Sequence, residues 1–242
     1  MPKLRLDQLV ADKGLATSRE RARALILAAQ VTVDGKVVSK AGAQVDSAAE
    51  VVLVARDHPY VGRGGLKLVH ALDTFGIVVA GREALDIGAS TGGFTDALLQ
   101  RGAARVVALD VGHGQLDWRL RNDRRVVVVE HFNARALTPA DLPGLVDIVT
   151  IDVSFISLRH ILPAVPPVLR PGADVLALVK PQFEAGRDEV GKGVIHDPAI
   201  HERVVDEIRR AAAAVGLSRA ASIPSPITGQ KGNVEFLLHL RP

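Results

Sequence analysis

The chain of 242 residues contains no cysteine. This absence excludes a disulfide framework, thiolate zinc sites and a cysteine nucleophile, and it makes a reducing cytoplasm the expected compartment. Aromatic residues make up only 3% of the sequence. A nucleic-acid partner must therefore be held mainly by charge rather than by many stacked rings.

The sequence also lacks a long uninterrupted hydrophobic run. Its most apolar long stretch, residues 161–179, contains four prolines and two charged residues, so we expect no membrane span. The charged N-terminal sequence lacks the apolar segment of a secretory signal. With 48% hydrophobic and 24% charged residues the chain is expected to be a soluble globular protein, and its formal net charge of +3 permits an anionic partner.

The first 57 residues predict a small α+β unit. A short helix is expected over residues 5–13, and a second helix from Thr17, which has capping-box spacing to Glu20. Residues 31–38 alternate between apolar and polar side chains around an Asp34-Gly35 pair, which predicts a β-hairpin. A further strand is expected over residues 50–54.

Basic side chains outnumber acidic ones by six to three in residues 1–23. This excess indicates either a solvated helix face or a surface that binds an anionic partner. The Arg-Leu-Asp opening, the Gly-Leu-Ala-Thr-Ser-Arg-Glu-Arg-Ala turn and helix, and the Val-Thr-Val-Asp-Gly-Lys-Val hairpin resemble the ribosomal-protein-S-four-like RNA-binding domain. The resemblance implies that this unit binds RNA through basic side chains. The candidates are Lys3, Arg5, Lys13, Arg19 and Arg23.

Beyond a short linker at residues 58–62, strands and helices alternate through a second domain at residues 63–242. Helices are expected over residues 94–101 and 199–214. Strands are expected over residues 83–87, 105–109, 126–129, 147–151, 175–179 and 234–240. The alternation predicts an α/β fold of Rossmann-like type, with a mostly parallel sheet covered by helices on both faces. Such sheets bind ligands at the carboxyl ends of their strands.

A glycine-rich turn follows the first of these strands. Its glycines let the backbone approach a ligand, and Asp110 after the next strand can accept hydrogen bonds from ribose hydroxyls. A dinucleotide and S-adenosylmethionine both fit, and a tight turn without a ligand is the alternative. The G-x-x-x-G-G spacing and Asp86 favour S-adenosylmethionine. The predicted cofactor contacts are Asp86, Gly88, Ala89, Ser90, Thr91, Gly92, Gly93, Phe94, Asp110 and Asp152.

Several charged side chains stand at the expected ends of these strands. Asp152 and Lys180 each end a strand, Glu235 lies just inside the last one, and Lys67 lies in a glycine-containing turn that we expect to be flexible. A charge embedded in an apolar run costs free energy unless it is paired, so Lys180 and Glu235 indicate more than solvated strand ends. Basic residues in or beside glycine-rich segments are predicted to contact RNA phosphates, with solvated loop charges as the alternative. They are Arg63, Arg187, Lys192 and Lys231.

Together with the glycine-rich turn, these segments resemble the FtsJ-type ribose 2′-O-methyltransferases. Their lysine–aspartate–lysine–glutamate tetrad matches Lys67, Asp152, Lys180 and Glu235 in chain order. Nearly end to end, the chain resembles the TlyA family, whose members are called hemolysins or rRNA cytidine-2′-O-methyltransferases. The resemblance implies S-adenosylmethionine-dependent methylation of cytidine ribose in small-subunit rRNA, and in some members also in large-subunit rRNA. Because the methyl group on a sulfonium is already activated, we expect the reaction to need no metal. The loop at residues 191–197 departs from the family, because it is one glycine short of the expected Lys-Gly-Gly.

Methyl transfer to a ribose hydroxyl requires alignment of the reacting atoms and loss of a proton. Lys180 is predicted to be the base or the group that orients the hydroxyl, with Lys67 favouring its neutral form and with Asp152 and Glu235 holding the lysines. The segment after Asp152 lacks the Pro-Pro-aromatic tetrapeptide of amino-methylating enzymes, which favours oxygen as the acceptor. A pore-forming cytolysin and a non-catalytic ribosome-binding factor are the rival hypotheses.

Overall fold

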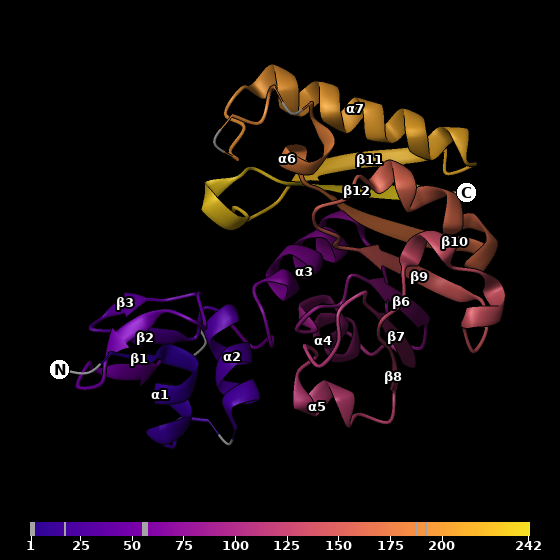
Figure 1. Cartoon of the computed structure of the whole chain (residues 1–242). Helices are drawn as coiled ribbons and strands as arrows, with labels where there is room; N and C mark the ends of the chain where they lie inside the picture. The colour runs from indigo at the N-terminus through magenta and orange to yellow at the C-terminus, as the bar shows by residue number, and fades with distance from the viewer. Residues whose placement is uncertain (1–2, 17, 55–57, 187, 192) are drawn as a thin grey trace. The chain divides into compact units, whose positions relative to one another are not determined.

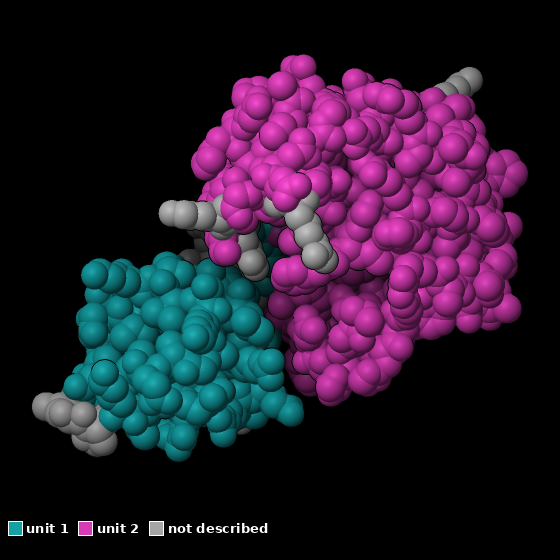
Figure 2. Space-filling view, turned by 45° about the horizontal axis from the view of Figure 1, so that its top comes forward, with its two compact units in different colours: residues 1–63 teal, residues 64–242 magenta. Residues whose placement is uncertain are grey.

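The computed structural model describes residues 3–16, 18–54, 58–186, 188–191 and 193–242. The chain divides into two compact units, residues 1–63 and residues 64–242, which are coloured separately in Figure 2. In the described part of the chain, no helix is both long enough and apolar enough to cross a membrane.

The first unit contains two small antiparallel sheets and two helices (Figure 1). Its elements are β1 (Lys3–Arg5), α1 (Leu6–Asp12), α2 (Arg19–Leu27), β2 (Val31–Val33), β3 (Lys36–Val37), β4 (Gln44–Asp46) and β5 (Val51–Leu53). The hairpin predicted around Asp34 and Gly35 is confirmed as β2 and β3. Both helices bury apolar side chains against the sheets, with Leu6, Val10 and Ile26 fully buried.

Two helix starts in this unit differ from the prediction. The first helix begins at Leu6 because the three residues before it pair with β4 as a strand. The second helix is capped by Ser18, whose Oγ accepts a hydrogen bond from Arg21 N at 3.1 Å. The predicted cap, Thr17, lies outside the described residues.

The second unit is built on a seven-stranded sheet. Its helices are α3 (Gly64–Phe75), α4 (Gly93–Gln100), α5 (Trp118–Arg121), α6 (Pro181–Glu184) and α7 (Pro198–Ala214). Its strands are β6 (Glu83–Ile87), β7 (Arg105–Leu109), β8 (Val126–Val129), β9 (Val146–Ile151), β10 (Leu169–Val179), β11 (Arg219–Pro224) and β12 (Phe236–Arg241). Short 3₁₀ helices are η1 (Ala134–Ala136), η2 (Pro139–Asp141), η3 (Leu158–His160), η4 (Leu162–Ala164), η5 (Pro166–Val168) and η6 (Gln230–Gly232).

The strand order is β11-β12-β10-β9-β6-β7-β8, with β12 antiparallel to both of its neighbours and the other pairs parallel. The chain leaves β6 toward β7 and β8 on one side and later returns to β9 and β10 on the other. The carboxyl ends of β6 and β9 therefore flank the topological switch point, where open α/β sheets bind their ligands. The predicted Rossmann-like α/β fold with a mostly parallel sheet is confirmed.

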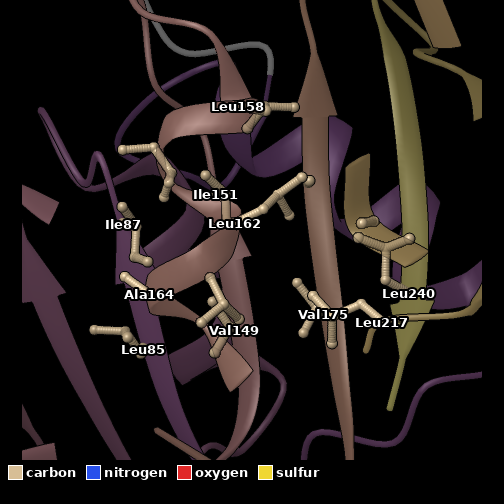
Figure 3. Packing of buried hydrophobic residues seen from close by; sticks show 14 of the residues in the cluster. Leu85, Ile87, Val149, Ile151, Leu158, Leu162, Ala164, Val175, Leu217 and Leu240 are labelled. Atoms are coloured by element: carbon tan, nitrogen blue, oxygen red, sulfur yellow. The ribbon is translucent and has the colours of Figure 1, made fainter. Parts of the chain in front are cut away.

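Alternate residues of the sheet face two separate helical layers. Leu85, Val149 and Val175 lie on the same face of the sheet as Leu158 of η3 and Leu162 of η4 (Figure 3). Helix α7 packs against η3 and η4 and adds its buried side chains to the same core. The opposite face is covered by α3 and α4, which also pack against each other. Because both faces are buried, the central strands are almost continuously apolar, which is why their positions were predictable.

A buried carboxylate in the middle of β10 links this strand to β12 and to the residue before β6. Asp174 is only 2% exposed, and it accepts hydrogen bonds from His239 Nε2 at 2.8 Å, Arg82 Nη1 at 2.8 Å and Arg241 Nε at 2.6 Å. Burial by itself raises the pKa of Asp174, but the bonds from His239, Arg82 and Arg241 outweigh it and hold that pKa well below its ordinary value. The carboxylate is therefore ionised in the folded protein.

Replacing Asp174 with alanine is expected to destabilise the second unit by roughly 2–4 kcal/mol, because three basic groups lose their shared partner. Urea denaturation followed by circular dichroism measures this loss. Asp206→Ala is the matched control, since it removes an exposed carboxylate that pairs with Arg209 at 3.2 Å on the surface of α7. Equal stability of the two variants would contradict a structural role for Asp174.

Candidate active site

The glycine-rich turn after β6 is shaped by close contact with the strand beside it. Gly88 has φ +84°, and a Cβ atom there would lie 2.4 Å from the backbone oxygen of Asp152. Its amide donates to the Leu109 carbonyl at 2.8 Å, while Asp152 N donates to the Ile87 carbonyl at 2.9 Å. Only glycine fits this position, where the carboxyl ends of β6, β7 and β9 meet.

The turn continues into α4 through the adjacent glycines Gly92 and Gly93. Gly92 precedes the helix with φ +96°. A Cβ on Gly93 would lie 3.2 Å from Gly65 N and 3.3 Å from Gly64 Cα, so the first turns of α3 and α4 approach at backbone distance. The absence of side chains at these positions brings the start of α3 beside the turn.

Asp110 organises the other side of the turn. One carboxylate oxygen accepts from Ser90 N and the other from Gly112 N, both at 2.7 Å. Each oxygen keeps a second lone pair, so the side chain can still accept a hydrogen bond from a ribose hydroxyl. Its placement directly after β7 is the one expected for a nucleoside site.

Asp86 lies inside the protein rather than on the surface of the turn. It is fully buried, and its carboxylate accepts hydrogen bonds from Thr95 Oγ1 at 2.7 Å and Thr150 Oγ1 at 2.9 Å. Burial raises the pKa of Asp86 to about 7, and the threonine hydroxyls counter this only in part. Its contact with a cofactor remains a prediction.

Lys67 and Glu235 form a buried ion pair between α3 and the segment that leads into β12. They are 8% and 3% exposed, so each charge depends on the other for compensation. Gly229 makes room for the pair, because a Cβ there would lie only 2.0 Å from Glu235 Oε1. The distant ends of the second unit are thereby joined at one point.

Two details of the sequence prediction are wrong here. Lys67 lies on α3 and not on a flexible turn, because the glycines before it allow close packing with α4 and because Leu68 and Leu72 are buried. Glu235 directly precedes β12 instead of lying within it.

The second lysine has its own carboxylate. Lys180 Nζ lies 2.6 Å from Asp152 Oδ1 and donates a hydrogen bond to Ser154 Oγ at 2.8 Å. Pro181 follows immediately and starts α6, so the lysine stands where strand changes to helix. The positive charge of Lys67 is balanced by the carboxylate of Glu235. The arrangement therefore gives no support to the prediction that Lys67 favours the neutral form of Lys180.

Strand pairing places Asp152, Lys180 and Glu235 at one edge of the sheet, and the ion pair with Glu235 brings Lys67 there. Val179, just before Lys180, pairs with Phe236, just after Glu235. Ala177 of β10 pairs with Ile151, the residue before Asp152. Asp152 in turn touches Gly88 through its backbone, so the two ion pairs lie beside the glycine-rich turn.

Sequence reasoning missed three residues at this edge. Ser154 holds Lys180, and Asn233, only 3% exposed, bonds to Gly193 O at 2.9 Å and Ile195 N at 3.3 Å. Phe155 is 89% exposed and has φ +64°, with its ring 5.0 Å from that of Phe183. The only signal for Phe155 in the sequence was an aromatic residue shortly after a strand-ending aspartate.

The predicted RNA contacts are spread over both units. Lys3, Arg23, Arg63 and Lys231 are exposed. Arg5 and Arg19 are also exposed and share the buried carboxylate of Asp7, at 2.8 Å and 3.4 Å. Lys13 donates to the Ala49 carbonyl at 3.2 Å. Arg187 and Lys192 lie outside the described residues.

Among the described residues, no group of three or more histidine, aspartate or glutamate side chains is arranged to hold a metal ion. The charged side chains at the sheet edge are instead paired lysine with carboxylate.

Comparison with known families agrees with this arrangement. Residues 60–242 match the FtsJ-like methyltransferase family, and residues 4–51 match the S4 domain family. The fold and the sheet-edge site thus define an enzyme of the FtsJ-like methyltransferase class, preceded by an S4 domain.

Individual relatives cover almost the whole chain. It is 50% identical over 98% of its length to the 16S/23S rRNA (cytidine-2′-O)-methyltransferase TlyA of Mycobacterium tuberculosis, of which it covers 89%. It is 43% identical over 98% of its length to Hemolysin A of Brachyspira hyodysenteriae, of which it covers 99%. A solved structure from Streptococcus thermophilus, provisionally described as a hemolysin, has a TM-score of 0.77 at 46% identity, covering 99% of this chain and 88% of that one. The chain belongs to the TlyA family.

The buried carboxyl of Asp86 makes stability depend on pH. Its folded pKa of about 7 exceeds the ordinary value of 3.8, so the folded state retains a proton that the unfolded chain has lost, and stability falls as pH rises from about 4 to about 7. Asp86→Asn is expected to flatten this fall, which urea titrations at pH 5 and pH 8 measure. Asp188→Asn, at an exposed position, should leave the wild-type slope unchanged. A wild-type slope in Asp86→Asn would refute the assignment.

Proposed function

We propose that this protein transfers a methyl group from S-adenosylmethionine to the 2′-hydroxyl of a cytidine in ribosomal RNA. The observation that carries the proposal is the pair of lysine–carboxylate contacts beside the Gly88 turn. The name of the Mycobacterium tuberculosis relative supplies the substrate class, which includes the RNA of both ribosomal subunits. We infer that rRNA is the partner and the cytoplasm the compartment.

The residues around the turn fit S-adenosylmethionine. Gly88 leaves no space for a side chain, and Asp110 stands ready for ribose hydroxyls. The predicted contacts at residues 88–94 would line the amino-acid and ribose portions, with Asp152 adjacent. When bound, the cofactor supplies a methyl group already activated on a sulfonium centre, so the protein's task is alignment and control of the hydroxyl proton.

Lys180 is assigned the contact with the ribose hydroxyl. An ammonium has three donor protons, and the contacts with Asp152 and Ser154 leave at least one for a substrate oxygen. Since Lys180 is paired with a carboxylate, we assign it the role of orienting the hydroxyl and stabilising the negative charge that develops on the oxygen as the hydroxyl proton is lost to solvent water. The ion pair of Lys67 and Glu235 fixes the neighbouring wall of the site.

RNA is held by charge on both units and by an exposed ring near Lys180. Arg5 and Arg19 are pre-oriented by Asp7, which reduces the entropy lost when they bind phosphates. Phe155 presents a solvent-exposed ring and directly follows Ser154, which bonds to Lys180. An exposed aromatic face close to the proposed catalytic lysine suits stacking with an RNA base.

The name of the Brachyspira hyodysenteriae relative motivates one alternative, a cytolytic activity. Dye release from phospholipid vesicles by the purified protein, without cofactor, tests it directly. Methyl transfer to ribosomal subunits without dye release supports the methyltransferase assignment.

Lys180→Ala is expected to lower kcat for methyl transfer by at least about 100-fold, the usual effect of removing a group that stabilises a developing oxyanion. Transfer of labelled methyl groups to ribosomal subunits measures it, and blocked ribose reactivity maps the product. S-adenosylmethionine affinity, measured by calorimetry, should change little. Lys36→Ala, on the exposed strand β3, is the control. Full activity of Lys180→Ala would exclude the assigned role.

Phe155→Ala is expected to lower kcat/KM for the RNA by about 5- to 150-fold, which corresponds to one lost base-stacking contact. Affinity for S-adenosylmethionine should stay the same, because the ring lies in the exposed loop beyond the turn. Phe155→Tyr keeps an aromatic face and should retain most of the activity. If the alanine variant matches the wild type, no base stacks on this ring.

A further inference from the structure

The strongest unassigned feature of the second unit is a buried carboxylate that the proposed chemistry does not use. Glu184, at the end of α6, is 8% exposed. Burial raises the pKa of its carboxyl above the ordinary value, with the bonds it accepts opposing that effect. Burying a carboxyl group costs free energy, so its bonds must compensate.

Both oxygens of Glu184 bond to the loop that follows β9. Ser157 Oγ donates to Oε2 at 2.5 Å, and Leu158 N donates to Oε1 at 2.8 Å. Ser157 Oγ in turn accepts from Arg159 N at 3.2 Å and so caps η3. The carboxylate therefore fixes the far end of the loop at residues 152–158.

The same two segments are joined at their other end by Lys180. Its Nζ contacts Asp152 and Ser154. The segment 180–184 is therefore bonded to the start of the 152–158 loop through Lys180 and to its end through Glu184. Between these two sets of bonds, Phe155 adopts a left-handed backbone conformation and packs against Phe183. A left-handed backbone costs free energy for a residue with a bulky side chain, and it persists only when its surroundings enforce it.

We propose that Glu184 is a positioning residue, which holds the 152–158 loop so that Asp152 and Ser154 keep Lys180 in the geometry for methyl transfer. This inference rests on the proposed function, because the consequence concerns the role of Lys180. The backbone of Asp152 is fixed separately through its bond to the Ile87 carbonyl. Loss of Glu184 should therefore disturb Lys180 more than the cofactor turn.

The test compares Glu184→Ala, Glu184→Gln and the control Glu189→Ala in the full chain. Glutamine keeps an acceptor for Leu158 N and a polar group for Ser157, so kcat is expected to fall at least about 10-fold in the alanine variant and less than about 3-fold in the glutamine variant. Glu189 also accepts a backbone amide, at 2.9 Å from Gly186 N, and pairs with Arg203, but it has no bond to the 152–158 loop. Its removal should leave kcat close to the wild-type value.

Hydrogen exchange provides a readout that does not depend on activity. In Glu184→Ala, exchange should accelerate in peptides covering residues 153–160 and 180–185, while the rest of the sheet and the calorimetric affinity for S-adenosylmethionine stay as in the wild type. If the alanine variant does not fold, Ser157→Ala, which removes only one of the two bonds, replaces it with the same expectation at smaller magnitude.

Each outcome decides the matter. Unchanged kcat in Glu184→Ala, or unchanged exchange at residues 153–160, overturns the proposal. Equal losses of kcat in the alanine and glutamine variants overturn it as well. Such a result would mean that activity depends on the negative charge of Glu184 and not on the hydrogen bonds that position the loop. If the wild-type protein does not methylate rRNA, the proposed function fails, and the exchange measurement still decides whether Glu184 holds the loop.

Discussion

A charge inside a protein needs an opposite charge within reach, and this constraint governs the second unit. Lys67 and Glu235 are separated by almost the whole length of the domain, yet neither is stable in its buried position alone. Their pairing fixes α3 against the segment before β12. The pairing of β12 with β10, in which Val179 lies opposite Phe236, brings Lys180 and Glu235 to the same edge of the sheet.

The close contacts at this edge depend on glycine. Gly88 accommodates the backbone of Asp152, and Gly229 accommodates the carboxylate of Glu235. A single methyl group at either position would collide with an atom that the site requires. At Gly88 and Gly229, a neighbouring group therefore occupies the volume that a side chain would need. Gly88 is required for a second reason, because its backbone is left-handed.

Two charged clusters on β10 differ in how completely their hydrogen-bonding capacity is used. In the middle of β10, Asp174 is bonded by three basic side chains, which leaves it little capacity for a ligand and gives it a structural role. At the carboxyl end, Lys180 is held by Asp152 and Ser154 but retains a donor. A hydrogen-bond network in which every partner is satisfied stabilises the fold. A lysine that keeps an unused N–H donor beside the glycine-rich turn can instead bond to a substrate.

Local patterns in the sequence determined the strands at residues 83–87, 105–109 and 126–129, the hairpin around Asp34 and the class of the fold. Each depends on alternation, apolar runs or turn residues that act over a few positions. The candidate residues Lys67, Asp152, Lys180 and Glu235 were also named from the sequence, through the family resemblance. The tertiary structure alone decided which lysine pairs with which carboxylate, that Lys67 lies on a helix, and that Ser154, Phe155 and Glu184 surround the site. These features depend on contacts between segments far apart in the chain, and such contacts form only when the sheet has set its strand order and register.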